Sequence, residues 1–111
     1  MSNYLNSILQ ECKSGLLAIF GDKLKQIILY GSHARGDFNS ESDIDVMVLV
    51  EMADDEIIMN REEIMELGAE LSYDNDTMIS IIVKDIDHFN SWLPVYPFYE
   101  NIMKEGVEVF G

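Results

Sequence analysis

Cysteine, basic residues and long apolar runs are scarce in this sequence, and each scarcity excludes a class of protein. The 111 residues include 1 cysteine, Cys12, so no disulfide can form within the chain. No uncharged apolar run reaches the roughly 18 residues of a membrane-spanning helix, so no membrane association is expected. The first residues also lack the basic segment and the apolar segment of a signal peptide. We therefore expect a cytoplasmic protein.

Basic residues are few: 7 lysines and arginines stand against 21 aspartates and glutamates, which gives a formal net charge of −14 at pH 7. An acidic surface repels the phosphate backbone of nucleic acids, so we expect no direct nucleic-acid binding. The charge suits divalent cations or a basic protein partner instead. For most of these acids, a solubilising role on an exposed surface is a sufficient explanation.

Along the chain, segments in which apolar residues have the spacing of a helix alternate with segments in which they have the pattern of a strand. At 111 residues the chain is long enough for one modest core, and we predict a single domain over residues 1–111. Strands that are few and covered by helices predict an α/β fold of the α+β two-layer type. The predicted helices span residues 2–20, 54–72 and 98–108, with a short one starting near 87, and the predicted strands span 25–30, 43–51 and 77–83.

Residues 92–99 combine 2 prolines with 4 aromatic side chains. Because proline fixes φ and lacks a backbone N–H, residues 92–97 are predicted to form an extended crossing and not a helix or a central strand. The aromatic side chains have two interpretations that the sequence leaves open. They form an exposed docking surface for a partner, or they cover the core at the edge of the sheet.

Residues 29–50 carry the strongest functional signal. A Gly31-Ser32 turn follows the first predicted strand of this stretch, and Asp43 and Asp45 open the second. Side chains two positions apart on a strand share a face, so both carboxylates point the same way, toward the turn. Two acids on an otherwise apolar strand are costly unless a cation or solvent meets them. A chance combination in a polar loop is the alternative, and the fixed spacing makes it rare.

The turn has the composition of a phosphate site. Gly31 permits a tight turn and a close approach to a ligand, and Ser32 precedes a short helical piece that Gly36 is predicted to end. A hydroxyl and free backbone N–H groups at the start of a helix bind phosphate. Mg²⁺ prefers hard oxygen ligands and commonly joins carboxylates to phosphates. We therefore predict a metal–nucleotide site between the turn and the two carboxylates.

This motif resembles a known signature. Gly31-Ser32, ten intervening residues that include Ala34-Arg35-Gly36, and Asp43-Ile44-Asp45 are similar to the signature of the DNA polymerase β-like nucleotidyltransferase superfamily. The short chain resembles the minimal (MNT) members in particular. The resemblance implies a small mixed sheet with helices packed against it, a nucleoside triphosphate substrate, and two Mg²⁺ ions. It also implies transfer of NMP, most simply AMP from ATP, to a hydroxyl group.

The resemblance also implies roles for individual residues. Gly31 and Ser32 would hold the triphosphate, and Asp43 and Asp45 would bind the metal ions as the catalytic carboxylates. Arg35 would reach a phosphate, contact a partner, or tie the loop down. Minimal members are often encoded beside HEPN-type RNase toxins, and some act as antitoxins by AMPylating a toxin tyrosine. A HEPN-type toxin is therefore the partner that the resemblance implies.

One expected acid is absent. The superfamily uses a third carboxylate on a neighbouring strand, where it completes the second metal site and helps to deprotonate the attacking hydroxyl. Ser80 is the only polar residue inside the strand predicted over 77–83, and it is the best match to that acid. Asp74 or Asp76 would replace it only if the turn folds back, and Asp85 lies at the far end of the strand. Two hypotheses follow: an active adenylyltransferase, or a catalytically weakened fold that binds a nucleotide or a partner.

Overall fold

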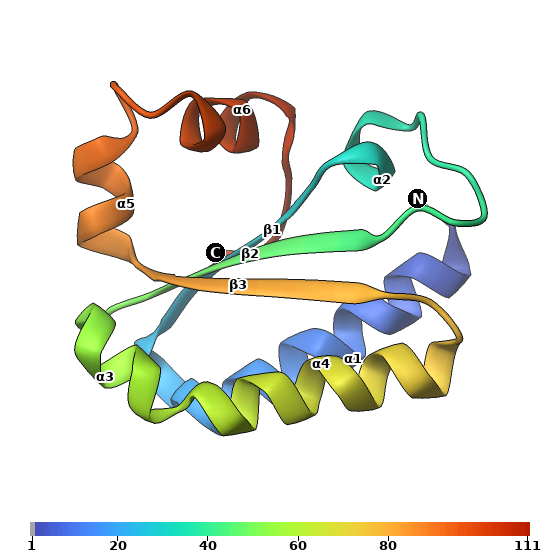
Figure 1. The fold of residues 1–111 in the computed structure, drawn as a ribbon, viewed down its shortest axis with the longest axis horizontal. Helices are drawn as coiled ribbons and strands as arrows, with labels where there is room; N and C mark the ends of the chain where they lie inside the picture. Colours follow the sequence, from blue (N-terminus) through green and yellow to red (C-terminus); the bar gives the residue numbers. More distant parts are fainter. Residues whose placement is uncertain (1) are drawn as a thin grey trace.

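A four-stranded mixed sheet forms the centre of this computed structural model, which describes residues 2–111 (Figure 1). The strands are β1 Leu24–Tyr30, β2 Ile44–Val50, β3 Ile79–Asp85 and β4 Val107–Phe110. They lie in the order β3-β2-β1-β4. Strand β2 runs antiparallel to β1 and parallel to β3, and β4 runs antiparallel to β1.

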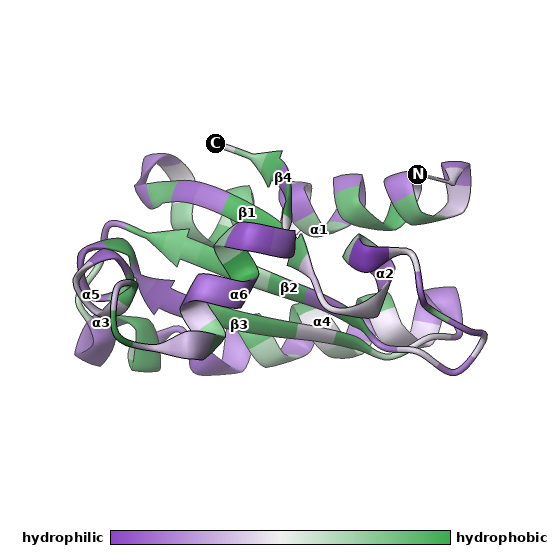
Figure 2. Ribbon diagram, turned by 90° about the horizontal axis from the view of Figure 1, so that it is seen from above, coloured by the Kyte–Doolittle hydropathy of each residue, from purple (hydrophilic) through white to green (hydrophobic). Residues whose placement is uncertain are grey.

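Helices cover both faces of this sheet. Helices α1 Asn3–Phe20 and α4 Arg61–Asn75 pack on one face, while α5 Ile86–Trp92 and α6 Pro97–Glu105 lie over the other (Figure 1). The shorter elements are the 3-10 turn η1 Gly21–Lys23, α2 Ser32–Arg35 and α3 Asp54–Met59. Seen from the α6 side, mostly hydrophobic strands lie beneath the hydrophilic surfaces of α6 and α2 (Figure 2). Among residues 2–111 we find no helix that combines the length and the apolar character needed to cross a membrane.

The predicted fold class is confirmed, because a small mixed sheet is covered by packed helices. Strand β2 is buried on both faces, which explains its nearly continuous apolar sequence. Val46 and Val48 point into the core beneath α1 and α4. Met47 points into a second core, which Phe89 of α5 helps to fill. The same alternation places Asp45 on the α5 and α6 face of the sheet.

The helix predicted over residues 54–72 is wrong as a single element, because it divides into α3 and α4 at Asn60. The Asn60 backbone leaves the helical region, with φ −99° and ψ 9°. Its side-chain Nδ2 donates a hydrogen bond to the Glu56 carbonyl at 3.2 Å. Asparagine side chains often compete in this way with the backbone hydrogen bonds of a helix.

Residues 92–97 do not form the predicted extended crossing. Helix α5 continues to Trp92, whose carbonyl accepts hydrogen bonds from the backbone N–H groups of Val95 at 3.1 Å and Tyr96 at 2.8 Å. Pro97 then opens α6, at a position where the missing N–H would have no helical partner. Tyr99 is 6% exposed and covers the core, whereas Trp92 and Tyr96 are 53% and 47% exposed. The core-cover interpretation therefore holds for Tyr99 and not for these two rings.

Strand β4 is missing from the sequence prediction, which indicates a helix over residues 98–108. Helix α6 ends at Glu105, and Gly106 adopts an extended backbone with φ −70° and ψ 154°. Val107 then pairs with Leu29 of β1. A strand of 4 residues is too short to show a period of its own, so its pairing with β1 decides its structure.

Candidate active site

Two glycines bound the single helical turn α2 that follows β1. Gly31 has φ 76° and ψ −157°, and Gly36 has φ 85° and ψ 7°. Residues with a Cβ atom rarely adopt either conformation. The Gly31 carbonyl accepts hydrogen bonds from the backbone N–H groups of Ala34 and Arg35, each at 3.1 Å. The predicted turn is therefore present, with Ser32 as its first helical residue.

The Asp45 carboxylate lies directly against this turn. Asp45 is opposite Tyr30 in the β1–β2 ladder, and a Cβ atom placed on Gly31 would lie 2.5 Å from the Oδ2 atom of Asp45. Residue 31 therefore has no room for a side chain. Asp43 precedes β2, is exposed, and lies close enough for its charge to act on Asp45. The structure thus brings the turn and the carboxylate pair together.

The electrostatic environment of Asp45 favours a cation. Burial raises the pKa of Asp45 above its ordinary value, and the negative charge of Asp43 raises it further. His33 and Arg35 lower this pKa, but their effects are smaller. A carboxylate whose charged form is disfavoured in this way gains from any positive ion that binds beside it.

Asp45→Asn should stabilise the metal-free protein by about 0.5 kcal/mol at pH 7, because it removes a partly desolvated charge at constant side-chain size. A carboxyl group with a raised pKa binds its proton more tightly in the folded state. Proton binding therefore stabilises the folded state in full at pH values below the pKa of the group in the unfolded chain. This stabilisation is lost as the pH rises through the pKa of the group in the folded protein. The difference in the free energy of unfolding between the variant and the wild type should become smaller as the pH falls toward about 4. Urea denaturation measures it, and a variant less stable than the wild type at pH 7 would contradict this account.

Asp43 and Asp45 supply the hard oxygen atoms that Mg²⁺ prefers, so the pair suits a metal ion that also takes oxygens from a phosphate. Ser80 is opposite Asp45 in the parallel β2–β3 ladder, which is the position expected for the third acid. No group of three or more Asp, Glu, His or Cys side chains is placed to hold a metal ion in the part of the chain that the structure describes. The residues therefore fit one bridging metal ion and lack an acid for a second.

None of the other candidate acids takes the place of Ser80. Asp85 is opposite Val50, at the other end of β3. Asp74 lies in the last turn of α4 and Asp76 is the C-cap of that helix, which packs on the opposite face of the sheet. Asp74 lines a surface hollow there, together with side chains of α1.

Arg35 ties α2 to its surroundings. Its Nε lies 3.1 Å from Oδ2 of Asp37, and a terminal guanidinium nitrogen lies 3.4 Å from Oε2 of Glu105 in α6. Of the roles considered for Arg35, this geometry directly shows the tie between segments. Contact with a phosphate stays a prediction, although the charge of Arg35 already acts on Asp45.

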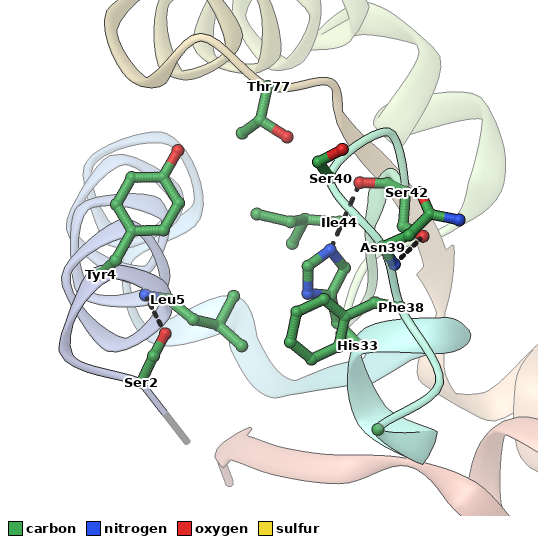
Figure 3. A pocket seen from close by; sticks show the side chains of 11 residues that line it. Ser2, Tyr4, Leu5, His33, Phe38, Asn39, Ser40, Ser42, Ile44 and Thr77 are labelled. Atoms are coloured by element: carbon green, nitrogen blue, oxygen red, sulfur yellow. Dashed lines mark hydrogen bonds between the residues drawn. The ribbon is translucent and has the colours of Figure 1, made fainter.

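His33 lies against the loop that leads to Asp43. Its ring stacks on Phe38 with centroids 4.4 Å apart, and its Nε2 lies 3.3 Å from the Ser42 carbonyl oxygen. Its Nδ1 is buried without a hydrogen-bond partner among the described residues. With Tyr4 of α1, these side chains line a pocket of about 480 Å³ (Figure 3). None of the predicted phosphate or metal residues lines this pocket.

A second pocket, of about 390 Å³, adjoins the carboxylate face between α2 and α6. It is lined by Tyr30, Gly31, Arg35, Phe98, Asn101, Ile102 and Glu105. The position of Tyr30 follows from strand alternation, but this residue lies outside the motif that predicts the site. The contributions of α6 were also missed, because only tertiary packing brings that helix to the turn.

Most of the chain matches known proteins. A family model described as "Polymerase beta, Nucleotidyltransferase" matches residues 16–111. "Putative protein adenylyltransferase MJ0141" of Methanocaldococcus jannaschii is 37% identical over 76 residues, which cover 68% of this chain and 75% of that protein. "Putative protein adenylyltransferase MJ0604" of the same organism is 31% identical over 98 residues, which cover 88% of this chain and 90% of that protein.

Solved structures share the fold. A crystal structure of a toxin–antitoxin with AMP-PNP has a TM-score of 0.65 at 22% identity, covering 93% of this chain and 73% of that one. A crystal structure of a mutant of the toxin–antitoxin MntA-HpeT has a TM-score of 0.63 at 19% identity, covering 93% of this chain and 72% of that one. At these identities the similarity establishes the fold alone.

Proposed function

This chain belongs to the polymerase beta nucleotidyltransferase family, and from this premise we propose that it transfers AMP from Mg-ATP to a hydroxyl group of a partner protein. The observation that carries the proposal is the Asp45 carboxylate seated against the Gly31 turn, with Asp43 beside it. Such a site puts carboxylate oxygens and phosphate oxygens within reach of one metal ion. The choice of AMP is supported by the relatives that are named protein adenylyltransferases.

In the proposed reaction, the acceptor hydroxyl loses its proton to solvent water and its oxygen bonds to the α-phosphorus, while the bond from that phosphorus to the leaving pyrophosphate breaks. Gly31 and Ser32 hold the triphosphate through backbone N–H groups and the Ser32 hydroxyl. Asp43 and Asp45 would hold Mg²⁺, which would supply positive charge against the phosphoryl oxygens. Arg35 supplies a further positive charge on the same side of the sheet.

The second candidate function is a catalytically weakened fold that binds a nucleotide or a partner without efficient transfer. The register that places Ser80 beside Asp45 favours it. A serine hydroxyl is a poor metal ligand and a poor base at neutral pH, so the acceptor proton has no carboxylate to receive it there. Nucleotide binding suffers less, because the bridging metal ion relies on Asp43 and Asp45.

Ser80→Asp should raise the rate of AMP transfer by about 100-fold, because a positioned general base contributes on this scale. The affinity for Mg-ATP should change by less than about threefold, since the phosphate turn is untouched. Initial rates with labelled ATP measure the effect, and Ser80→Ala is the matched control, expected to behave like the wild type. A folded Ser80→Asp variant that transfers no faster would show that Ser80 does not stand in for the missing acid.

Two experiments test the proposed function itself. The first incubates the protein with ATP labelled at the α-phosphate, Mg²⁺ and the protein encoded next to it, and follows label on the partner. A demonstrated complex that gains no label would reject transfer and leave the binding function. The second measures thermal stability, because Mg-ATP at about 100 times its dissociation constant should add about 2.7 kcal/mol. An unchanged melting temperature would count against both nucleotide functions.

The proposed acceptor is a basic protein partner. The net charge of −14 favours such a partner and disfavours nucleic acid. Similar folds occur in the two toxin–antitoxin structures, which supports a toxin as the acceptor. The HEPN type of that toxin, the cytoplasmic location and the single domain over residues 1–111 stay predictions.

A further inference from the structure

The pocket between α2 and α6 contains a corner of aromatic rings. The rings of Tyr30 and Phe98 meet edge to face, with centroids 5.7 Å apart and planes at 81°. Tyr96 meets Phe98 in the same way, with centroids 6.2 Å apart and planes at 82°. Phe98 lines the pocket and is 37% exposed, so part of its side chain is open to a ligand. An aromatic surface of this kind binds flat, apolar ring systems by stacking.

The polar groups of the pocket suit an uncharged ligand. Its charged side chains are Arg35 and Glu105, and they pair with each other at 3.4 Å. Asn101 is exposed on the same wall and offers one amide acceptor and two donors. A volume of about 390 Å³ lies within the range of small-molecule sites. A heterocyclic base matches this combination of an aromatic platform, charged side chains that are already paired and a hydrogen-bonding edge.

We propose that this pocket holds the base of the nucleotide, stacked on Phe98 and hydrogen-bonded by Asn101. The assignment rests on the proposed function, which places the triphosphate at the Gly31 turn. Gly31 and Tyr30 both line the pocket, and Tyr30 is opposite Asp45 in the β1–β2 ladder. The turn proposed to hold the triphosphate is therefore part of the wall of this pocket. The pocket at His33 shares none of the proposed phosphate or metal residues.

Two substitutions of the same kind test the assignment. Phe98→Leu removes the stacking surface in this pocket, and Phe38→Leu makes the same change in the pocket at His33, where Phe38 is 52% exposed. Both proteins are titrated with Mg-ATP and with inorganic tripolyphosphate plus Mg²⁺ by calorimetry. We expect Phe98→Leu to weaken the affinity for Mg-ATP by about 10-fold and to leave the affinity for tripolyphosphate unchanged. Phe38→Leu should bind both ligands like the wild type.

The outcomes separate this inference from the proposed function. If the wild type binds Mg-ATP and Phe98→Leu binds it equally well, the base is not in this pocket, and the proposed function stands. If Phe38→Leu loses the affinity instead, the base lies in the pocket at His33. If the wild type binds neither ligand, both proposals fail. If Phe98→Leu does not fold, Asn101→Ala takes its place in the test, because Asn101 is exposed and its substitution should not disturb the fold. This variant should bind Mg-ATP more weakly and bind tripolyphosphate like the wild type.

Discussion

Asp43→Asn should reduce AMP transfer by roughly 1,000-fold and leave the fold intact. Asp43 is exposed and precedes β2, so the amide replaces the carboxylate without a change in packing. The substitution removes one of the two carboxylates proposed to hold the metal ion. A loss of roughly 4 kcal/mol of transition-state stabilisation corresponds to that factor. The measurement is the initial rate of labelled AMP transfer to the partner at saturating Mg-ATP.

The matched control for this substitution is Glu41→Gln. Glu41 is exposed in the same loop, two residues before Asp43, and it loses the same charge. A general effect of negative charge near the site would slow both variants alike. A role as metal ligand slows only Asp43→Asn. Transfer by Asp43→Asn within tenfold of the wild type would rule out the proposed role of this carboxylate.

Gly31→Ala should destabilise the protein by about 3 kcal/mol and abolish the stabilisation by Mg-ATP. With φ 76° and ψ −157°, Gly31 occupies a backbone region that is almost restricted to glycine, and holding alanine in this region costs about 1–3 kcal/mol. The added Cβ would also lie 2.5 Å from Oδ2 of Asp45 and displace that carboxylate. Urea denaturation with and without Mg-ATP measures both effects.

Gly36→Ala provides the comparison, because Gly36 also has a positive φ but open space around the Cβ position. Its cost should be only about 1 kcal/mol, and Mg-ATP should still stabilise it. In an Asp45→Ala background, Gly31→Ala should cost less than in the wild type, since the carboxylate in contact has gone. An equal cost in both backgrounds would mean that the contact with Asp45 contributes nothing to the strain.

The sequence was sufficient for those parts of the site that depend on local periodicity. Strand alternation placed Asp45 on the face of the turn, and the need for positive φ placed Gly31 and Gly36 at the two ends of α2. The position of Ser80 followed from its place inside a predicted strand, and the parallel ladder puts it opposite Asp45. These features require only neighbours in sequence or a simple pairing of adjacent strands.

The parts that the sequence did not predict depend on contacts between distant segments. Strand β4 exists because β1 offers an unpaired edge. The break at Asn60 is the exception, because it depends on a local hydrogen bond to the Glu56 carbonyl. The aromatic corner and the Arg35–Glu105 contact arise only when α6 packs over β1. The amphipathic period of residues 97–105 predicts a buried face but not the segments that this face meets, so the sequence did not predict the pocket between α2 and α6.

The two halves of the candidate site also differ in how far apart their residues lie along the chain. The phosphate turn and the carboxylates belong to one hairpin, β1–β2, while the outer wall of the pocket comes from α6. Arg35 and Glu105, which meet across it, are 70 positions apart. Closing a longer loop costs more entropy, so the contact between Arg35 and Glu105 depends on the packing of α6, whereas the contacts of the hairpin do not. On the proposed assignment, local opening of α6 would therefore expose the base and leave the turn and the carboxylates in place.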